Sequence, residues 1–404
     1  SFFDSYKLSL ALSLLASGLL MYVALRDRVG KVGAWVGALL YSLAPYRMVD
    51  IFVRGALGES LSFIFPPLLL LGFGRHSYPL LVIGWAGLFL THPVAAALFS
   101  AFFLGHMIIN KTSWREFVVP YVVALLIASF NLLPTLTYTR HTYYSPALSD
   151  TMLMFPTLAQ LISSPWGYGV SLPGTNDGMS FELGVVQWVI LLWFGAKVIR
   201  RFNNERGYWL GMAGVNLLLM LPLAIPLYRL FLGQVIDFPW RLLMTLVFVI
   251  ALMGADVANR VRKYELRLMI GLIVTIALFW QTIPMAHTNK YWNSTHDEAF
   301  FARETGDSYG EYAPRTRVTR DSAPFGKRAE FVRGEGEITT LIGQSNQQKY
   351  RIVATGDGHI RINTAYFPGW VIPSECRVST RTLPHIDDSG LIECPVMKGE
   401  QIIE

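Results

Sequence analysis

The sequence has little charge. Asp, Glu, Lys and Arg together make up 15% of the 404 residues, whereas about 25% is usual for a soluble domain. The shortage is uneven, because residues 1–284 consist of apolar runs with short polar breaks and residues 285–404 have the composition of a soluble protein. Lipid is therefore the expected main solvent of the first part, with a domain boundary near Pro284.

The motifs of several enzyme classes are also missing. The sequence contains no metal-binding motif, phosphate-loop lysine signature, nucleophile elbow or dinucleotide fingerprint. It implies no cofactor, although a divalent cation stays open. The apolar runs hold almost no charged residues, which gives little support to an ion or proton relay through them.

The chain begins at Ser1 without an initiator Met or a charged region ahead of an apolar stretch, so no signal peptide is expected. Residues 399–404 have the pattern of a β-strand that breaks off. We therefore expect both ends to be artificial and the chain to begin inside a longer protein.

Ten apolar runs are long enough, or nearly so, to cross a hydrocarbon core about 30 Å thick. They are approximately 5–25, 32–45, 60–74, 78–91, 94–109, 117–136, 182–199, 208–226, 240–257 and 268–284. Runs 32–45 and 78–91 are short, which leaves tilt, re-entrance or a miscounted pair open. The expected fold of residues 1–284 is an α-helical polytopic membrane bundle of about ten helices.

Lys and Arg are concentrated in alternate loops. One set of loops holds fourteen of them: Arg26, Arg28, Lys31, Arg75, Lys111, Arg115, Lys197, Arg200, Arg201, Arg206, Arg260, Arg262, Lys263 and Arg267. The other set holds five: Arg47, Arg54, Arg140, Arg229 and Arg241. Cytoplasmic loops are enriched in Lys and Arg, so the first set is predicted to be cytoplasmic. The net charge of +6 then reflects topology rather than a nucleic-acid partner, and residues 285–404 are expected on the extracytoplasmic side of the cell (plasma) membrane.

Arg47, Asp50, Arg54 and Glu59 lie between two apolar runs on the predicted outer side. In a helix, Asp50 and Arg54 would form an i, i+4 pair. A structural ion pair that pins an interfacial helix is one interpretation, and snorkelling of the arginines to lipid headgroups is another. The third is an anion-binding or acid/base site, because charges at membrane depth are costly and tend to mark substrate paths.

Two further polar groups lie on the same predicted side. His92 can titrate near neutral pH or donate to a phosphate, or it caps a helix before Pro93. Trp240 and Arg241 follow Pro239, a usual residue at a helix start, where backbone N–H groups favour anions. This pattern predicts a phosphate clamp, and a simple Trp/Arg interface anchor is the alternative.

Residues 137–181 form a long outer loop that is rich in aromatic residues. It contains Arg140, Trp166, Tyr168 and Asp177. Loops of this length are usually functional or disordered, and the aromatic density argues against disorder. Aromatic faces with Asn, Asp and Gly between them suit sugar stacking and hydroxyl recognition. An aromatic belt at the membrane interface is the alternative for part of the set.

From about residue 320, apolar and polar residues alternate and Gly-containing turns recur. This pattern predicts an antiparallel all-β domain, arranged as a sandwich, over 321–404 after a linker at 285–320. Cys376 and Cys394 are the only cysteines. On an oxidising side of the membrane they would form a disulfide between neighbouring strands, and two buried thiols are the alternative.

Several motifs resemble those of one group of polytopic membrane proteins. These motifs are Tyr41-Ser42-Leu43-Ala44-Pro45-Tyr46, Val53-Arg54-Gly55-Ala56-Leu57-Gly58-Glu59, Ser164-Pro165-Trp166-Gly167-Tyr168-Gly169, Asn176-Asp177-Gly178-Met179-Ser180-Phe181, Phe238-Pro239-Trp240-Arg241 and Tyr366-Phe367-Pro368-Gly369-Trp370. They are similar to stretches of the 6-pyruvoyl-tetrahydropterin synthase-related membrane proteins, which are relatives of the YfhO-type proteins. The resemblance spans nearly the whole chain.

The resemblance implies the GT-C glycosyltransferase architecture, in which a sugar passes from a polyprenyl-phosphate carrier to an acceptor on the outer membrane face. In that superfamily the catalytic acidic residue lies in the first outer loop. Residues 5–25 look like the second helix of the family, so that loop would precede Ser1. The pterin-synthase part of the family label has no support, because the sequence has no soluble metal-binding histidine set.

The leading hypothesis is a membrane glycosyltransferase of the hexosyl or pentosyl class, acting in cell-envelope or glycoconjugate synthesis. Its partners would be the lipid bilayer, a polyprenyl-phosphate sugar and an unknown acceptor. Glu59, His92 and Asp50 are the catalytic candidates, for proton transfer from the acceptor hydroxyl. The substrate-binding candidates are Arg47, Arg54, Arg140, Trp166, Tyr168, Asp177, Trp240 and Arg241. The alternative is a transporter or flippase of lipid-linked material, or a non-enzymatic envelope-assembly protein that presents the β domain.

Overall fold

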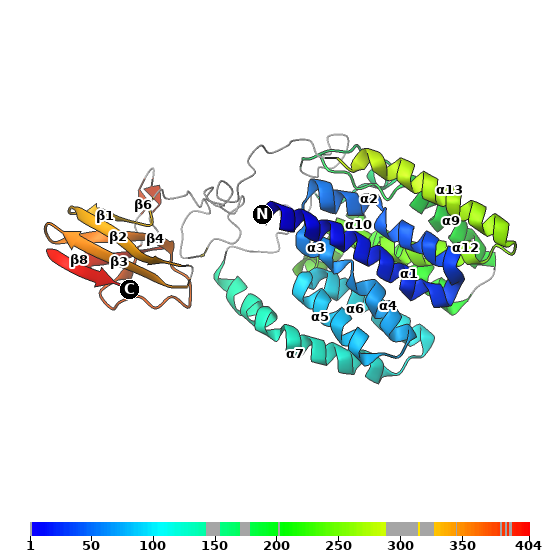
Figure 1. The fold of residues 1–404 in the computed structure, drawn as a ribbon, viewed down its shortest axis with the longest axis horizontal. Coiled ribbons are helices and arrows are strands. Elements are labelled where there is room, and N and C mark those ends of the chain that lie inside the picture. Colours follow the sequence, from blue (N-terminus) through cyan, green and yellow to red (C-terminus); the bar gives the residue numbers. More distant parts are fainter. Residues whose placement is uncertain are drawn as a thin grey trace. The chain divides into compact units, whose positions relative to one another are not determined.

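A computed structural model provides the structure of the chain, drawn in Figure 1. It describes residues 2–142, 154–169, 178–200, 203–287, 314–315, 327–344, 346–379, 382–383, 386–387 and 390–404. The chain forms two compact units: residues 1–132 with 146–297, and residues 133–145 with 298–404. The first unit is helical and the second contains the sheets. Most of the predicted linker 285–320 lies outside the described residues.

The first helical element, α1 (Phe2–Ser42), doubles back on itself at Gly30. Gly30 has φ 69° and ψ 173°, a backbone conformation that is open almost only to glycine. The two arms lie side by side, since a Cβ built at Gly18 would be 2.5 Å from Ser42 Oγ. The predicted spans 5–25 and 32–45 are therefore the two arms of one helical hairpin.

The other predicted spans all fall on helices, but 60–74 covers parts of two helices and 208–226 ends in a second helix. The helices after α1 are α2 (Pro45–Met48), the π-helical turn η1 (Val49–Val53), α3 (Leu57–Ser62), α4 (Phe65–Gly74), α5 (Tyr78–Thr91), α6 (Pro93–Asn110), α7 (Trp114–Tyr138), α8 (Leu158–Ile162), α9 (Val185–Arg200), α10 (Asn204–Met220), α11 (Ile225–Leu230), α12 (Leu242–Asn259) and α13 (Tyr264–Thr282). Short 3-10 turns cover 139–141, 222–224, 232–234, 239–241 and 283–285.

Six helices among the described residues are long and apolar enough to cross a membrane, or seven if α10 and α11 form one span bent by 82°. The chain is thus a multi-pass membrane protein, and the predicted count of ten spans is not confirmed. The difference has a physical source: the α1 hairpin is continuous through Gly30 and counts as one helix, and α5 and α9 are shorter than a full span.

Helix α12 is the centre of the helical unit. Within its apolar window 89% of the residues are buried, whereas the figure is 22% for both α7 and α13. The second arm of α1 packs against α12 through Gly33 and Gly37, where a Cβ would come within 2.8 Å of Ala255 O and 3.0 Å of Ala251 O. Small residues four apart let two helix backbones approach closely, which is a common packing mode in membranes.

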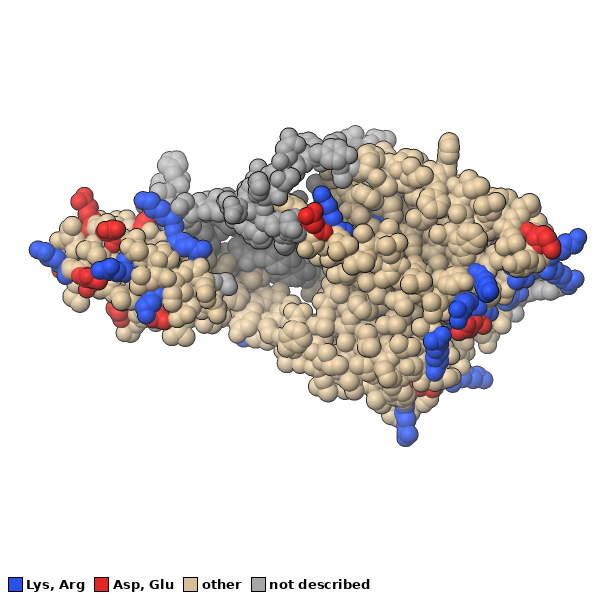
Figure 2. Space-filling view, in the orientation of Figure 1, with Lys and Arg blue, Asp and Glu red and all other residues tan. Residues whose placement is uncertain are grey.

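The loops predicted to share one side of the membrane do lie together. Figure 2 shows Lys and Arg gathered at one end of the helical unit. Ion pairs join these loops across long stretches of sequence: Arg28 to Glu205 at 3.1 Å and Arg75 to Asp27 at 3.4 Å. At the other end, Tyr6 at the start of α1 donates a hydrogen bond to the carbonyl of Gly55. The alternation read from the sequence therefore sorts the loops correctly into two ends.

The second unit contains antiparallel sheets, as predicted. The strands are β1 (Ala329–Arg333), β2 (Gly336–Gly343), β3 (Gln348–Ala354), β4 (Gly358–Ala365), β5 (Arg377–Val378), β6 (Thr382–Leu383), β7 (Ile386–Asp387), β8 (Leu391–Val396) and β9 (Gly399–Ile403). Their orders are β1-β4-β8-β5, β2-β3-β9 and β6-β7. Alternate residues of β3 are buried, and these pack in one apolar cluster with residues of β4 and β8. The arrangement as a sandwich stays a prediction.

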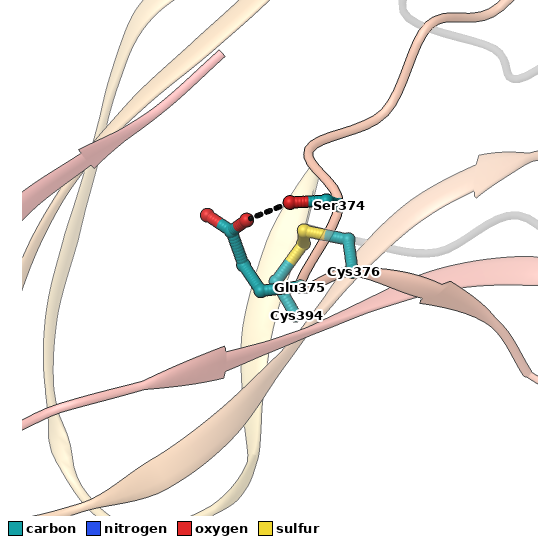
Figure 3. The surroundings of a disulfide bond; sticks show 4 residues. All are labelled: Ser374, Glu375, Cys376 and Cys394. Carbon is teal, nitrogen blue, oxygen red and sulfur yellow. Dashed lines mark hydrogen bonds between the residues drawn. A yellow bond between two sulfur atoms is a disulfide. The ribbon is translucent and has the colours of Figure 1, made fainter.

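Cys376 and Cys394 form a disulfide, which Figure 3 shows. Cys394 lies on β8 and Cys376 directly precedes β5, the strand that pairs with β8 at the edge of the larger sheet. Both cysteines are buried in the core of the second unit. The bond therefore ties the short edge strand to the sheet interior, as one of the two sequence interpretations expected.

We expect Gly30→Ala to destabilise the helical unit by about 1–3 kcal/mol, because alanine is strained in the backbone conformation of Gly30. The side chain itself has room, since the nearest atom to a Cβ there is Asn259 Oδ1 at 3.9 Å. Thermal unfolding in detergent measures the effect. Gly211→Ala is the matched control, because Gly211 lies in α10 with open space around it. Equal melting temperatures for the two variants would contradict the role of Gly30.

Candidate functional site

A cluster of charged side chains lies at the end of the helical unit opposite the basic loops. We call it the Glu59 cluster, and its members come from three separate segments. They are Tyr46, Asp50, Arg54, Glu59, His92, Asp237 and Arg241. The first four belong to the stretch α2–η1–α3, His92 to the junction of α5 and α6, and the last two to the entry of α12.

Glu59 is the centre of the cluster. Its side chain is 1% exposed, and its Oε2 is 2.8 Å from Arg54 Nη1, 3.6 Å from Arg241 Nε and 3.7 Å from His92 Nε2. Tyr46 donates its hydroxyl hydrogen bond to the other carboxylate oxygen. A buried charge is tolerated only when it is paired and hydrogen-bonded. Glu59 therefore fixes the positions of side chains from all three segments.

Each arginine also pairs with an aspartate one helical turn before it. Arg54 Nη1 is 2.5 Å from Asp50 Oδ1, as the i, i+4 spacing predicted. Arg241 pairs in the same way with Asp237, and its guanidinium lies over the ring of Phe238 at 4.9 Å. Two Asp-x3-Arg units thus converge on one glutamate.

His92 is the N-cap of α6. Its Nδ1 accepts a hydrogen bond from the Ala95 amide at 3.1 Å, so the proton of the neutral ring belongs on Nε2, which faces Glu59. Burial lowers the pKa of His92 to about 4, which keeps the ring neutral near pH 7. The helix-cap interpretation of His92 is therefore confirmed. With both ring nitrogens engaged in this way, His92 is poorly placed to act as a general base.

Asp50 is fully buried beside two arginines and a second carboxylate. Burial and the charge of Glu59 raise the pKa of Asp50, while Arg54 and Arg47 act in the opposite direction. Its Oδ2 has no hydrogen-bond partner among the described residues. With Asp50 ionised, the cluster holds three carboxylates against the two arginines Arg54 and Arg241, so protonation of Asp50 would balance its charge.

Arg54, Arg241, the neutral His92 and Asp237 form the outer layer of the cluster, and the carboxylates of Asp50 and Glu59 lie behind them. Arg54, His92 and Arg241 are 13–17% exposed, against 0% and 1% for the two carboxylates. Every described hydrogen bond of Arg54 uses Nη1; Arg241 donates to Asp237 through Nη1, and its Nε is buried 3.6 Å from Glu59 Oε2. Guanidinium N–H groups held in this way suit an anion with several oxygens, such as phosphate.

Two predicted substrate-binding residues lie in the interior instead. Arg47 is fully buried, donates to the Ser60 carbonyl at 3.1 Å and lies over the ring of Phe63. The ring of Trp240 is 4% exposed and stacks on Phe238. Both side chains are enclosed by neighbouring residues and contribute to packing, and their predicted role in binding stays a prediction. The helix start at Pro239 is as predicted.

The remaining candidates are not members of the Glu59 cluster or lie outside the described residues. Trp166 and Tyr168 contact each other edge to face, and the Tyr168 hydroxyl donates to the carbonyl of His287 at 2.5 Å. Arg140 belongs to the second unit, next to His141. Asp177 lies outside the described residues. Sugar binding by these four residues stays a prediction.

Two members of the cluster, Tyr46 and Asp237, are not among the site residues predicted from the sequence. The spacing of Asp237 and Arg241 repeats that of Asp50 and Arg54, and this repeat was the available signal. Tyr46 had no comparable signal, because its contact with Glu59 depends on the chain reversal through η1 and Gly55.

In the described part of the chain, no three His, Cys, Asp or Glu side chains are placed to hold a metal ion. Comparison of the chain with protein-family models, with curated proteins and with solved structures finds no match. The family resemblance therefore rests on the sequence motifs alone and stays a prediction.

We expect stability to fall as the pH drops from about 6.5 to about 4, and His92 to contribute to this fall. The folded-state pKa of His92 lies below its ordinary value, so its contribution is present above pH 6.5 and is lost as the pH falls through 4. The difference between the ordinary pKa of 6.5 and the folded-state pKa of about 4 corresponds to about 3 kcal/mol of unfolding free energy at most. His92→Asn keeps a side chain that can cap α6 and removes the titration.

The measurement is the melting temperature of both proteins in detergent between pH 4 and 7. The His92→Asn curve should be flatter than that of the wild type. His76→Asn is the control, because His76 is 72% exposed and its pair with Glu116 lies at the surface, so the curve should change little. Parallel curves for wild type and His92→Asn would show that His92 does not titrate as a buried group.

Proposed function

We propose that this chain is a membrane glycosyltransferase of GT-C architecture that takes its sugar from a polyprenyl-phosphate carrier. One observation carries the proposal: Glu59 holds Arg54 and Arg241, from helices far apart in the sequence, side by side with guanidinium groups partly exposed. A polar site of this kind, at the end of an apolar bundle and so near the membrane surface, suits a substrate with a lipid tail and a phosphate. The motif resemblance points the same way.

In this proposal the two arginines bind the phosphate of the donor. As the acceptor hydroxyl attacks the sugar, the bond between the anomeric carbon and the phosphate oxygen breaks, and negative charge grows on the leaving polyprenyl phosphate. Arg54 and Arg241 would stabilise that charge, because preorganised donors act most strongly where charge develops. The carrier would reach the site laterally from the bilayer.

Glu59 and His92 take different roles here from those that the sequence suggested. Glu59 is 1% exposed and fully engaged with cations and Tyr46, so it positions the arginines rather than accepting a proton from the acceptor. His92 supports the same carboxylate and caps α6. A carboxylate outside the Glu59 cluster is then required as general base.

The sidedness is part of the proposal. The basic end of the helical unit would face the cytoplasm, since Lys and Arg favour cytoplasmic loops. The Glu59 cluster and residues 285–404 would then face the outside of the plasma membrane, where the all-β domain could receive an envelope acceptor. The Cys376–Cys394 disulfide supports this side, because disulfides persist in oxidising compartments.

Transport of the lipid-linked sugar is the second candidate. The observation in its favour is the bend of 82° between α10 and α11, because broken helices are common where transporters bind their substrates. A flippase would move the donor across a vesicle bilayer without breaking the bond between sugar and phosphate. A transferase would consume the donor and release polyprenyl phosphate.

We expect the purified protein to bind a polyprenyl phosphate at least about tenfold more tightly than the matching polyprenol, which lacks the phosphate. Arg241→Gln should remove about tenfold to a hundredfold of the phosphate affinity, the usual value of one or two charge-assisted hydrogen bonds. Binding of the polyprenol should stay unchanged. Both affinities can be measured in detergent by titration of the fluorescence of the 11 Trp residues.

Arg75→Gln is the matched control, because Arg75 is an ion-paired arginine at the opposite end of the bundle. Melting temperatures identify variants that lose affinity by unfolding. Equal binding of phosphate and alcohol by the wild type would overturn the site. A second assay, in membranes supplied with polyprenyl-phosphate-linked sugar, measures donor cleavage; intact binding with no cleavage but with transbilayer movement would replace the transferase by the flippase.

A further inference from the structure

A second polar site lies at the basic end of the helical unit, away from the Glu59 cluster. A cavity of about 530 Å³ opens between α9, α10 and α12. Its charged lining consists of Lys197, Arg206, Asp256 and Arg260. Three cations against one carboxylate give the cavity a positive balance, which the proposed transferase chemistry does not use.

Asp256 is a shared anchor for the two arginines. Arg206 approaches it through Nε at 3.1 Å and Nη2 at 3.4 Å, and Arg260 through Nε at 2.7 Å and Nη2 at 3.0 Å. Both guanidinium groups thereby keep Nη1 without an acceptor among the described residues. Lys197 is exposed and has no ion-pair partner in the same part of the chain. The cavity thus holds cationic donors in fixed positions and one uncompensated lysine.

An apolar cavity of about 380 Å³ lies next to it between α1, α9, α12 and α13. Its lining contains only apolar side chains and Gly254, and the two cavities share Trp193 and Val257. Val189 and Ile273 in its lining are more than half exposed, so it opens on the outer surface of the bundle. Both volumes are within the range usual for small-ligand sites, about 300–1,000 Å³.

Helix α9 lines both cavities, and the polarity of its residues changes from the apolar cavity to the basic one. Along α9, every fourth residue faces the cavities: Val189, then Trp193, then Lys197, about 6 Å apart along the helix axis. The lining therefore changes from apolar to aromatic to basic towards the basic end of the bundle. Tryptophan is enriched at the boundary between hydrocarbon and headgroups, and basic side chains lie beyond it. The pair of cavities therefore has the polarity of a phospholipid, with its tail beside Val189 and its headgroup beside Lys197.

We propose that the two cavities together bind one anionic phospholipid of the leaflet at the basic end. Its phosphate and a second anionic or hydroxylated group would contact Lys197, Arg206 and Arg260, and one acyl chain would fill the apolar cavity. Basic pockets between transmembrane helices bind anionic headgroups by this combination of charge and apolar contact. The lipid would join α9 to α12 and α13 and stabilise their packing.

Native mass spectrometry of the purified full chain tests the proposal. Phosphatidylglycerol should bind at least about tenfold more tightly than phosphatidylcholine with the same acyl chains, with one tightly bound copy. Lys197→Gln combined with Arg260→Gln should reduce phosphatidylglycerol binding at least about tenfold. Lys111→Gln combined with Arg115→Gln should not, since these residues lie in the basic loops but outside the cavity lining.

Two further measurements distinguish binding of a lipid from binding of a free anion. Ala277→Phe places a ring in the apolar cavity and should weaken phosphatidylglycerol binding, with melting temperatures of the lipid-free variants as the check on folding. Glycerol phosphate and inorganic phosphate should bind far more weakly than the lipid. Tight binding of either soluble anion, equal binding of phosphatidylcholine, or equal effects of the two double substitutions would each overturn the proposal.

Discussion

The arrangement of the helical unit depends on one buried carboxylate that three cationic or polar segments share. Removing a single partner from a buried ion pair costs about 3–5 kcal/mol, whereas a well-packed apolar replacement of the whole group is often neutral. Stability alone therefore gives no reason to keep Glu59, Arg54 and Arg241. Their presence is easier to understand if the position of the arginines matters more than the energy of the pair.

The two ends of the bundle share one arrangement, in which a carboxylate pairs with two arginines. At one end Glu59 holds Arg54 and Arg241, and at the other Asp256 holds Arg206 and Arg260. In each case a carboxylate brings two guanidinium groups together that would otherwise repel each other. Under the two proposals, both arrangements would form a preorganised anion site at a membrane surface, each for an amphiphilic ligand.

Local features of the sequence predicted the structure well, and long-range contacts did not follow from them. Hydrophobic runs located the long helices, and the i, i+4 spacing gave the pair Asp50–Arg54, because both depend on neighbouring residues. The contact of Glu59 with Arg241 depends on how α3 meets α12. The burial of Trp240 likewise follows from packing against Phe181 and Phe238, whereas its sequence context beside Arg241 resembles that of an exposed interface anchor.

The composition of the Glu59 cluster also bears on how the chain enters the bilayer during synthesis. The stretch 46–59 contains two arginines and two carboxylates, and the stretch 237–241 contains one of each. Each stretch is therefore neutral by itself and carries its own counter-ion when it leaves the insertion machinery. Neither stretch has to wait with an uncompensated charge until its distant partner is made, although the completed cluster forms only after α12 is in place.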